Sequence, residues 1–138
     1  MHKETLTYED FDGNQRTEDF YFNLTEAELT EMEMSLNGGL SQLLEKIIKE
    51  DDRKEIIKYF KKIVLESYGV KSLDGRSFMK SEDIRNEFAS TKAYSDIFMK
   101  FASDDVAAST FINNIIPKSR ELKEVAKKAD LPTLQSAT

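Results

Sequence analysis

Few residues in this 138-residue sequence carry side chains that could catalyse a reaction. The chain has one histidine, His2, and no cysteine. His2 stands near the start of the chain, where we expect no nearby carboxylate to orient its ring, so a general-base role is not predicted. The acid pairs Asp51 with Asp52 and Asp104 with Asp105 do not face one another on a helix, and they suit helix N-caps. We therefore predict no catalytic residues.

Phosphate and metal sites are not predicted either. The glycine pair at residues 38–39 is followed by Leu-Ser, whereas a phosphate-binding loop ends in Lys-Ser or Lys-Thr. Asp74 and Gly75 would take the fifth and sixth positions of a calcium loop, but Val70 and Ser81 stand where the first and twelfth ligands belong. A turn or a short strand pair around Asp74 explains the same residues. We expect no metal ion, no cofactor and no enzymatic activity.

Length and composition indicate a single domain. Hydrophobic residues make up 39% of the chain and charged residues 33%, which is an ordinary balance for a globular protein. A chain of 138 residues can bury a core without disulfides. No apolar run approaches the roughly 18 residues of a membrane span, and residues 1–4 lead into an acidic segment unlike a signal peptide. We expect a cytoplasmic protein with no membrane partner.

The net charge of −6 is concentrated at the start of the chain. Residues 1–36 contain ten acids and two bases, whereas residues 117–138 contain three acids and five bases. An acidic surface repels phosphate backbones, so nucleic acid is not an expected partner. The acids serve either solubility alone or a surface complementary to a basic partner or a neighbouring subunit. The residues of that surface would be Glu9, Asp10, Asp12, Glu18, Asp19, Glu26, Glu28, Glu31 and Glu33.

The sequence pattern predicts a β-hairpin over residues 3–22. Polar and apolar residues alternate over residues 4–8, and Phe20 and Phe22 share one face of the second strand. The Asp-Gly pair at residues 12–13 supplies the positive φ that a tight turn requires. An isolated hairpin is marginal in water, so it must pack on the helices that follow or pair with a strand from another copy.

Helical spacing predicts helices between residues 25 and 116. Thr25 and Glu28 form a capping box for the first helix, and apolar stripes recur until Pro117, which disfavours helical geometry at the residue before it. The predicted fold is mainly α with an N-terminal β-hairpin (α+β), as a compact multi-helix single domain over residues 1–117. Residues 118–138 are predicted to form an amphipathic or disordered tail.

Several short motifs follow one another in a fixed order, at residues 8–13, 20–25, 68–69, 74–78, 93–95 and 111–117. Their order resembles that of the tail assembly chaperones of long-tailed bacteriophages and prophages. The resemblance covers nearly the whole chain up to Pro117, and its motifs are structural. It implies a protein of the host cytoplasm that binds the tape measure protein, keeps it soluble and promotes tail tube assembly. The tail tube protein and further copies of the chain are additional expected partners.

A chaperone for a long helical protein needs adaptable apolar contacts. The candidate partner-binding residues are Met32, Met34, Tyr94, Phe98 and Phe101, although each also suits a core position. One alternative is a structural tail or connector subunit that assembles through its hairpin edge. Another is an acidic protein that mimics nucleic acid, and the resemblance argues against this alternative.

Overall fold

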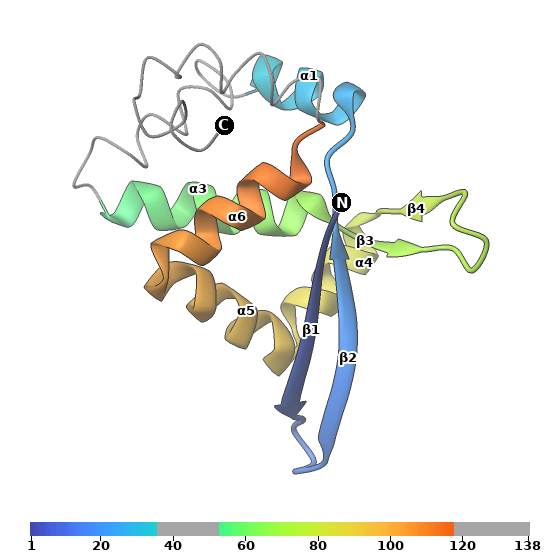
Figure 1. Cartoon of the computed structure of the whole chain (residues 1–138), viewed down its shortest axis with the longest axis vertical. Helices are drawn as coiled ribbons and strands as arrows, with labels where there is room; N and C mark the ends of the chain where they lie inside the picture. The colour runs from blue at the N-terminus through green and yellow to red at the C-terminus, as the bar shows by residue number, and fades with distance from the viewer. Residues whose placement is uncertain (36–52, 118–138) are drawn as a thin grey trace. The chain divides into compact units, whose positions relative to one another are not determined.

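The computed structural model describes residues 1–35 and 53–117 (Figure 1). The chain divides into two compact units: unit 1 comprises Met1–Asn23 and Asp52–Ile115, and unit 2 comprises Leu24–Asp51 and Ile116–Thr138. The described residues form a β-sheet and five helices, so the predicted α+β class is confirmed. That residues 1–117 form one domain stays a prediction, and the predicted tail lies outside the described residues.

The predicted N-terminal hairpin is present in unit 1. Strand β1 (His2–Glu9) pairs antiparallel with β2 (Gln15–Phe22), in a register that runs from His2 opposite Phe22 to Glu9 opposite Gln15. The Asp10 carboxylate holds the connecting turn by accepting hydrogen bonds from the backbone N–H groups of Asp12, at 3.0 Å, and Asn14, at 2.9 Å. Gly13 has a φ of 83°, the positive value expected from the Asp-Gly pair.

A second, shorter hairpin extends the sheet. Strand β3 (Tyr68–Lys71) pairs antiparallel with the end of β2, where Tyr21 lies opposite Gly69, and β4 (Phe78–Met79) pairs with β3. The sheet order is β1-β2-β3-β4. The first hairpin therefore gains its third strand from its own chain, and the predicted strand pair around Asp74 is confirmed. Figure 1 shows β3 and β4 projecting from the rest of unit 1.

Helices supply the rest of the described structure. Unit 1 contains α3 (Arg53–Ser67), α4 (Glu82–Ala89), α5 (Lys92–Ser103) and α6 (Asp105–Ile115), and unit 2 contains α1 (Glu26–Ser35). Side-chain oxygens at the N-caps accept hydrogen bonds from backbone N–H groups of the first turns of α4, α5 and α6. These caps are Ser81, Thr91 and Asp104. The capping box of α1 is also confirmed, because Thr25 and Glu28 exchange hydrogen bonds.

Aromatic rings form the core of unit 1. Phe22, which is fully buried at the end of β2, meets Phe111 edge-on at 5.3 Å between ring centroids and Phe88 at 5.9 Å. Phe101 stacks on Phe111 at 4.5 Å, and Tyr68 stacks on Phe88 at 4.0 Å. Because these rings come from β2, β3, α4, α5 and α6, their packing fixes the sheet against the helices.

Candidate partner-binding site

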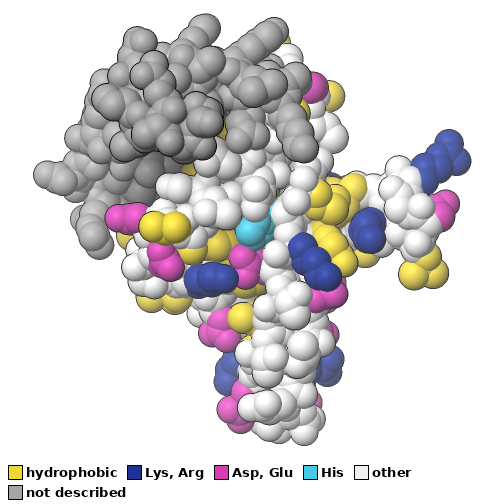
Figure 2. Space-filling model, in the orientation of Figure 1, with side chains coloured by type: hydrophobic (Ala, Val, Ile, Leu, Met, Phe, Trp, Pro, Cys, Tyr) yellow, Lys and Arg dark blue, Asp and Glu magenta, His cyan; other side chains and the backbone are white. Residues whose placement is uncertain are grey.

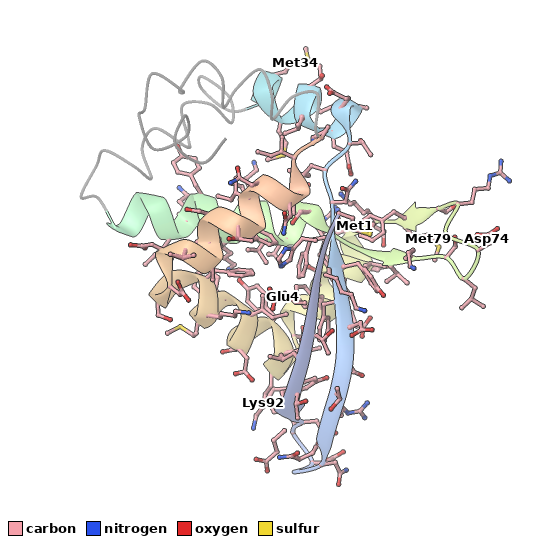
Figure 3. All side chains as sticks on the ribbon, viewed as in Figure 1. Met1, Glu4, Met34, Asp74, Met79 and Lys92 are labelled. Carbon is pink, nitrogen blue, oxygen red and sulfur yellow. The ribbon has the colours of Figure 1, made fainter. Side chains whose placement is uncertain are left out.

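The one histidine belongs to a polar network of unit 1 in which His2 and Glu4 are buried and Lys100 and Asn114 are exposed. Glu4 Oε1 lies 2.7 Å from His2 Nε2, and its other oxygen accepts a hydrogen bond from Lys100 Nζ at 3.0 Å. Asn114 Nδ2 lies 3.0 Å from His2 Nδ1. Our expectation that no carboxylate lies near His2 was wrong, because alternate residues of a strand share a face and Glu4 stands two residues on. Figure 3 labels Glu4, which points from β1 towards the helices.

This network can stabilise the fold but offers little for catalysis. Both ring nitrogens of His2 have hydrogen-bond partners, and both Glu4 oxygens are engaged. The ring also packs edge-on against Phe111 at 5.1 Å. Within the described ranges, no three His, Cys, Asp or Glu side chains gather where they could hold a metal ion.

A groove of about 650 Å³ opens in unit 1 between the first hairpin and the junction of α4 with α5. Aromatic rings line it, and those of Tyr8, Phe20 and Phe88 are buried. Phe11, in the hairpin turn, is 73% exposed, and Lys92 Nζ lies 5.3 Å from the centroid of its ring. The groove thus combines a buried aromatic wall with one exposed ring at its rim.

Acidic side chains outnumber basic ones around this groove. The charged lining residues are Asp10, Glu18, Asp19, Glu87, Arg16 and Lys92. Arg16 Nε contacts Asp10 at 2.7 Å, and this hydrogen bond holds the pKa of the Asp10 carboxyl below its usual range. Burial, with a 2.5 Å hydrogen bond to Glu18, raises the pKa of Tyr8 to about 12. Glu87 is exposed and forms no ion pair with any described residue.

The structure brings three of the five predicted partner-binding residues together on α5. The rings of Tyr94 and Phe98, one helical turn apart, are half-buried with centroids 5.9 Å apart. Phe101 is buried against Phe111 and belongs to the core. Met99, which sequence reasoning did not select, is 58% exposed and follows Phe98 directly.

The two predicted methionines lie on α1, in unit 2. Met32 is 7% exposed and Met34 is 85% exposed, and Figure 3 shows Met34 pointing out from its helix. The alternation between them reflects their two-residue spacing, which puts them on opposite sides of a helix. The role of the five residues in partner binding stays a prediction.

The predicted acidic surface is partly used for internal contacts. The Asp19 carboxylate accepts a hydrogen bond from the Thr5 hydroxyl at 2.7 Å, and this bond holds the pKa of Asp19 low. Asp10 and Glu18 bind Arg16, and Glu28 completes the capping box. These contacts leave fewer carboxylates for a partner than the sequence indicated.

Sequence reasoning missed the exposed apolar residues of the turns. Phe11 lies in the first hairpin's turn, and Leu73 lies in the turn between β3 and β4, where it is fully exposed. An apolar side chain inside an otherwise polar turn was the available signal, because such turns run over the surface. Met99 and Val106 gave no comparable signal, since apolar residues are frequent in helices.

The fold and its surfaces define a small α+β protein with apolar and acidic surfaces. Its described residues hold no metal-binding cluster. None of the helices in the described part of the chain has the length and hydrophobicity that a bilayer crossing requires. The sequence model of the family described as "Phage tail assembly chaperone" matches residues 1–138, the whole chain, and the chain belongs to this family. No curated protein sequence and no solved structure matches it. Membership implies tail-protein partners and points to a non-catalytic role.

Proposed function

We propose that this chain binds the tape measure protein of its phage in the host cytoplasm, keeps it soluble and promotes assembly of the tail tube. The family match over residues 1–138 is the observation that carries this proposal. Neither a catalytic reaction nor a cofactor is part of the proposed role. A tape measure protein is long and helical, so before assembly it exposes apolar stripes that need cover.

The outer side of α5 is the proposed contact surface in unit 1. Tyr94 and Phe98 are half-buried, so they keep ring surface available while the core holds their helix in place. Phe101 supports them from the core side by its stacking on Phe111. A partner helix that lays an apolar stripe along α5 would cover these two rings and, about 100° further round the helix, part of Met99, in the manner of helix-in-groove recognition.

Unit 2 would contribute an adaptable contact through Met34. Its side chain is unbranched and polarizable, and such side chains adjust to varied apolar partners. Met32 is buried and would support α1 without touching the partner.

Co-expression with the gene for the tape measure protein tests the proposal. The tape measure protein should accumulate in the soluble fraction only with this chain, and the two should co-purify. Met99→Glu, alone and with Phe98→Glu, should lower the soluble yield severalfold because a carboxylate would have to be buried in the contact. Val106→Glu is the matched control, since Val106 is an exposed apolar residue of α6 in the same unit.

Two results would contradict the proposal. The tape measure protein could stay insoluble in the presence of the folded chain, or the α5 variants could rescue it as well as the control does. The alternative of a structural tail or connector subunit predicts instead that the purified chain forms rings or tubes by pairing at β1, the edge strand of the described sheet, with no tape measure protein bound.

A further inference from the structure

The hairpin of β3 and β4, called here the arm (residues 68–80), has an ordered turn with an apolar tip. The Ser72 backbone N–H donates to the Ser77 carbonyl at 2.8 Å, and the Ser72 hydroxyl donates to Asp74 Oδ1 at 2.7 Å. The Arg76 backbone N–H donates to the same Asp74 oxygen at 3.1 Å. These bonds fix the turn, yet Leu73 within it is fully exposed. An ordered segment that presents an apolar side chain loses little entropy when it binds.

The base of the arm is packed firmly. A Cβ on Gly69 would lie 2.7 Å from Cε2 of Phe78, so the absence of a side chain there lets the Phe78 ring lie across β3. Val70 and Met79 are paired across the two strands, and both are exposed. Figure 2 shows hydrophobic side chains along the arm, with Lys and Arg side chains beside them.

The arm is basic and the groove is acidic. The arm carries Lys71, Arg76 and Lys80 against one acid, Asp74. The groove has four lining carboxylates against two cations, and Arg16 is already engaged by Asp10 and Glu18. Arg76 forms no ion pair with any described residue, as is true of Glu87 in the groove. An exposed apolar tip beside a free cation thus matches an aromatic groove beside a free carboxylate.

We propose that the arm of one copy of this chain docks in the groove of a second copy, with Leu73 against the aromatic wall and Arg76 paired with Glu87. The two surfaces belong to the same unit and share one residue, Tyr68 at the base of the arm, whereas the arm's turn lies outside the groove lining. In Figure 3 the labelled Asp74 of the arm tip lies far from the labelled Lys92 of the groove rim, so the arm cannot fill the groove of its own copy.

A contact of this kind is head-to-tail. A pair joined by one such contact leaves the groove of one copy and the arm of the other unoccupied, so the contact repeats from copy to copy and produces a ring or a short chain. It differs from assembly at the β1 edge, because no backbone pairing between strands is involved. It is also independent of the proposed α5 surface, since neither Tyr94, Phe98 nor Met99 lines the groove.

Sedimentation velocity and light scattering on the purified full chain test the proposal at concentrations up to about 1 mM. A dissociation constant above about 1 mM would be too weak to support it. The average mass should rise with concentration. Leu73→Asp, which blocks the arm, and Glu87→Lys, which blocks the groove, should each weaken self-association at least about tenfold. Circular dichroism and thermal melting must show that each variant is folded.

Matched controls exist for both variants. Val106→Asp places the same charge at an exposed apolar residue of α6, and Glu82→Lys makes the same exchange at an exposed acid of α4. Both controls should associate like the unchanged chain, because neither residue belongs to the arm or the groove.

Mixing the two blocked variants gives the sharpest readout. The Glu87→Lys copy keeps an intact arm, and the Leu73→Asp copy keeps an intact groove. An equimolar mixture should therefore form one-to-one dimers and stop there, at concentrations where each variant alone associates only weakly. A contact between two like surfaces would stay broken in the mixture, whereas a contact between an arm and a groove is restored, because one intact arm meets one intact groove.

Three results would overturn the proposal. The unchanged chain could remain monomeric over the whole concentration range, or the folded variants could associate as it does, or the mixture could stay monomeric. If the unchanged chain is monomeric but a lysine-rich amphipathic peptide binds it and Glu87→Lys prevents that binding, the groove has a different occupant and the proposal fails.

Discussion

The Tyr8 hydroxyl keeps its proton to an unusually high pH. Burial, followed by the hydrogen bond to Glu18 and the charge of that carboxylate, raises its pKa to about 12, against about 10 for an ordinary tyrosine. Because the folded-state pKa is the higher one, the folded chain binds more protons than the unfolded chain between these values. The contribution of Tyr8 to the free energy of unfolding should therefore be fully present below about pH 10 and be lost as the pH rises towards 12.

Ultraviolet difference titration and thermal melting check this prediction. Tyr8→Phe should remove the latest tyrosine titration and make the loss of stability above pH 10 shallower. Part of the late titration will remain, because burial also raises the pKa of Tyr68 and Tyr94. Tyr21→Phe is the control and should leave the titration near pH 12 in place. A late titration of the same amplitude in Tyr8→Phe would show that the assignment is wrong.

His2 marks the limit of what single residues reveal in the sequence. Strand alternation could have placed Glu4 beside it, since residues two apart share a face. The contacts with Lys100 and Asn114 could not be anticipated, because those residues lie 96 and 112 positions away along the chain from Glu4 and His2 respectively. Local patterns contain no information about such pairs, and only the packing of β1 against α5 and α6 creates them.

At the scale of elements, the arm depends on the close approach of Phe78 to Gly69. Gly69→Ala would place a methyl group 2.7 Å from Phe78 Cε2 and 3.0 Å from the Met79 carbonyl oxygen. The ring and the strand must shift, so we expect a loss of about 1–3 kcal/mol in the free energy of unfolding. Self-association should weaken as well, because the arm would no longer be held in order.

Chemical denaturation measures the loss, with Val70→Ala as the control. Val70 follows Gly69 on β3 and is exposed, so its truncation should cost no more than about 0.5 kcal/mol. Equal effects of the two substitutions would mean that β3 adapts to the added methyl group and that the close contact is unimportant.

Elements marked by local signals could be predicted, and those made by long-range pairing could not. The Asp-Gly turn, the Thr25 capping box and the Asp104 cap are short sequence patterns with direct physical causes, and all three are present. The pairing of β3 with the end of β2 joins residues about 48 positions apart, Tyr21 with Gly69, and depends on where α3 ends. The groove was missed for the same reason, because its walls come from β1, β2, β3, α4 and the start of α5.

At the scale of the whole molecule, the proposals assign two tasks to two separate surfaces. The α5 surface is apolar, whereas the contact between arm and groove combines apolar burial with opposite charges. Raising the salt concentration from about 0.1 M to about 1 M shortens the Debye length from about 10 Å to about 3 Å. Self-association should weaken over this range, because charge attraction is screened. Capture of the tape measure protein should persist, because apolar burial does not depend on that attraction.

The same separation should appear in the variants. Leu73→Asp should weaken self-association at least about tenfold and still capture the tape measure protein, whereas Met99→Glu should lower capture severalfold and still self-associate. Pull-down yield and sedimentation on the same preparations measure both properties at once. Loss of both properties in either folded variant would mean that one surface serves both tasks, or that only the assembled form binds. The mixture of Leu73→Asp with Glu87→Lys then separates these outcomes, because its dimers should regain capture only if assembly is what the tape measure protein requires.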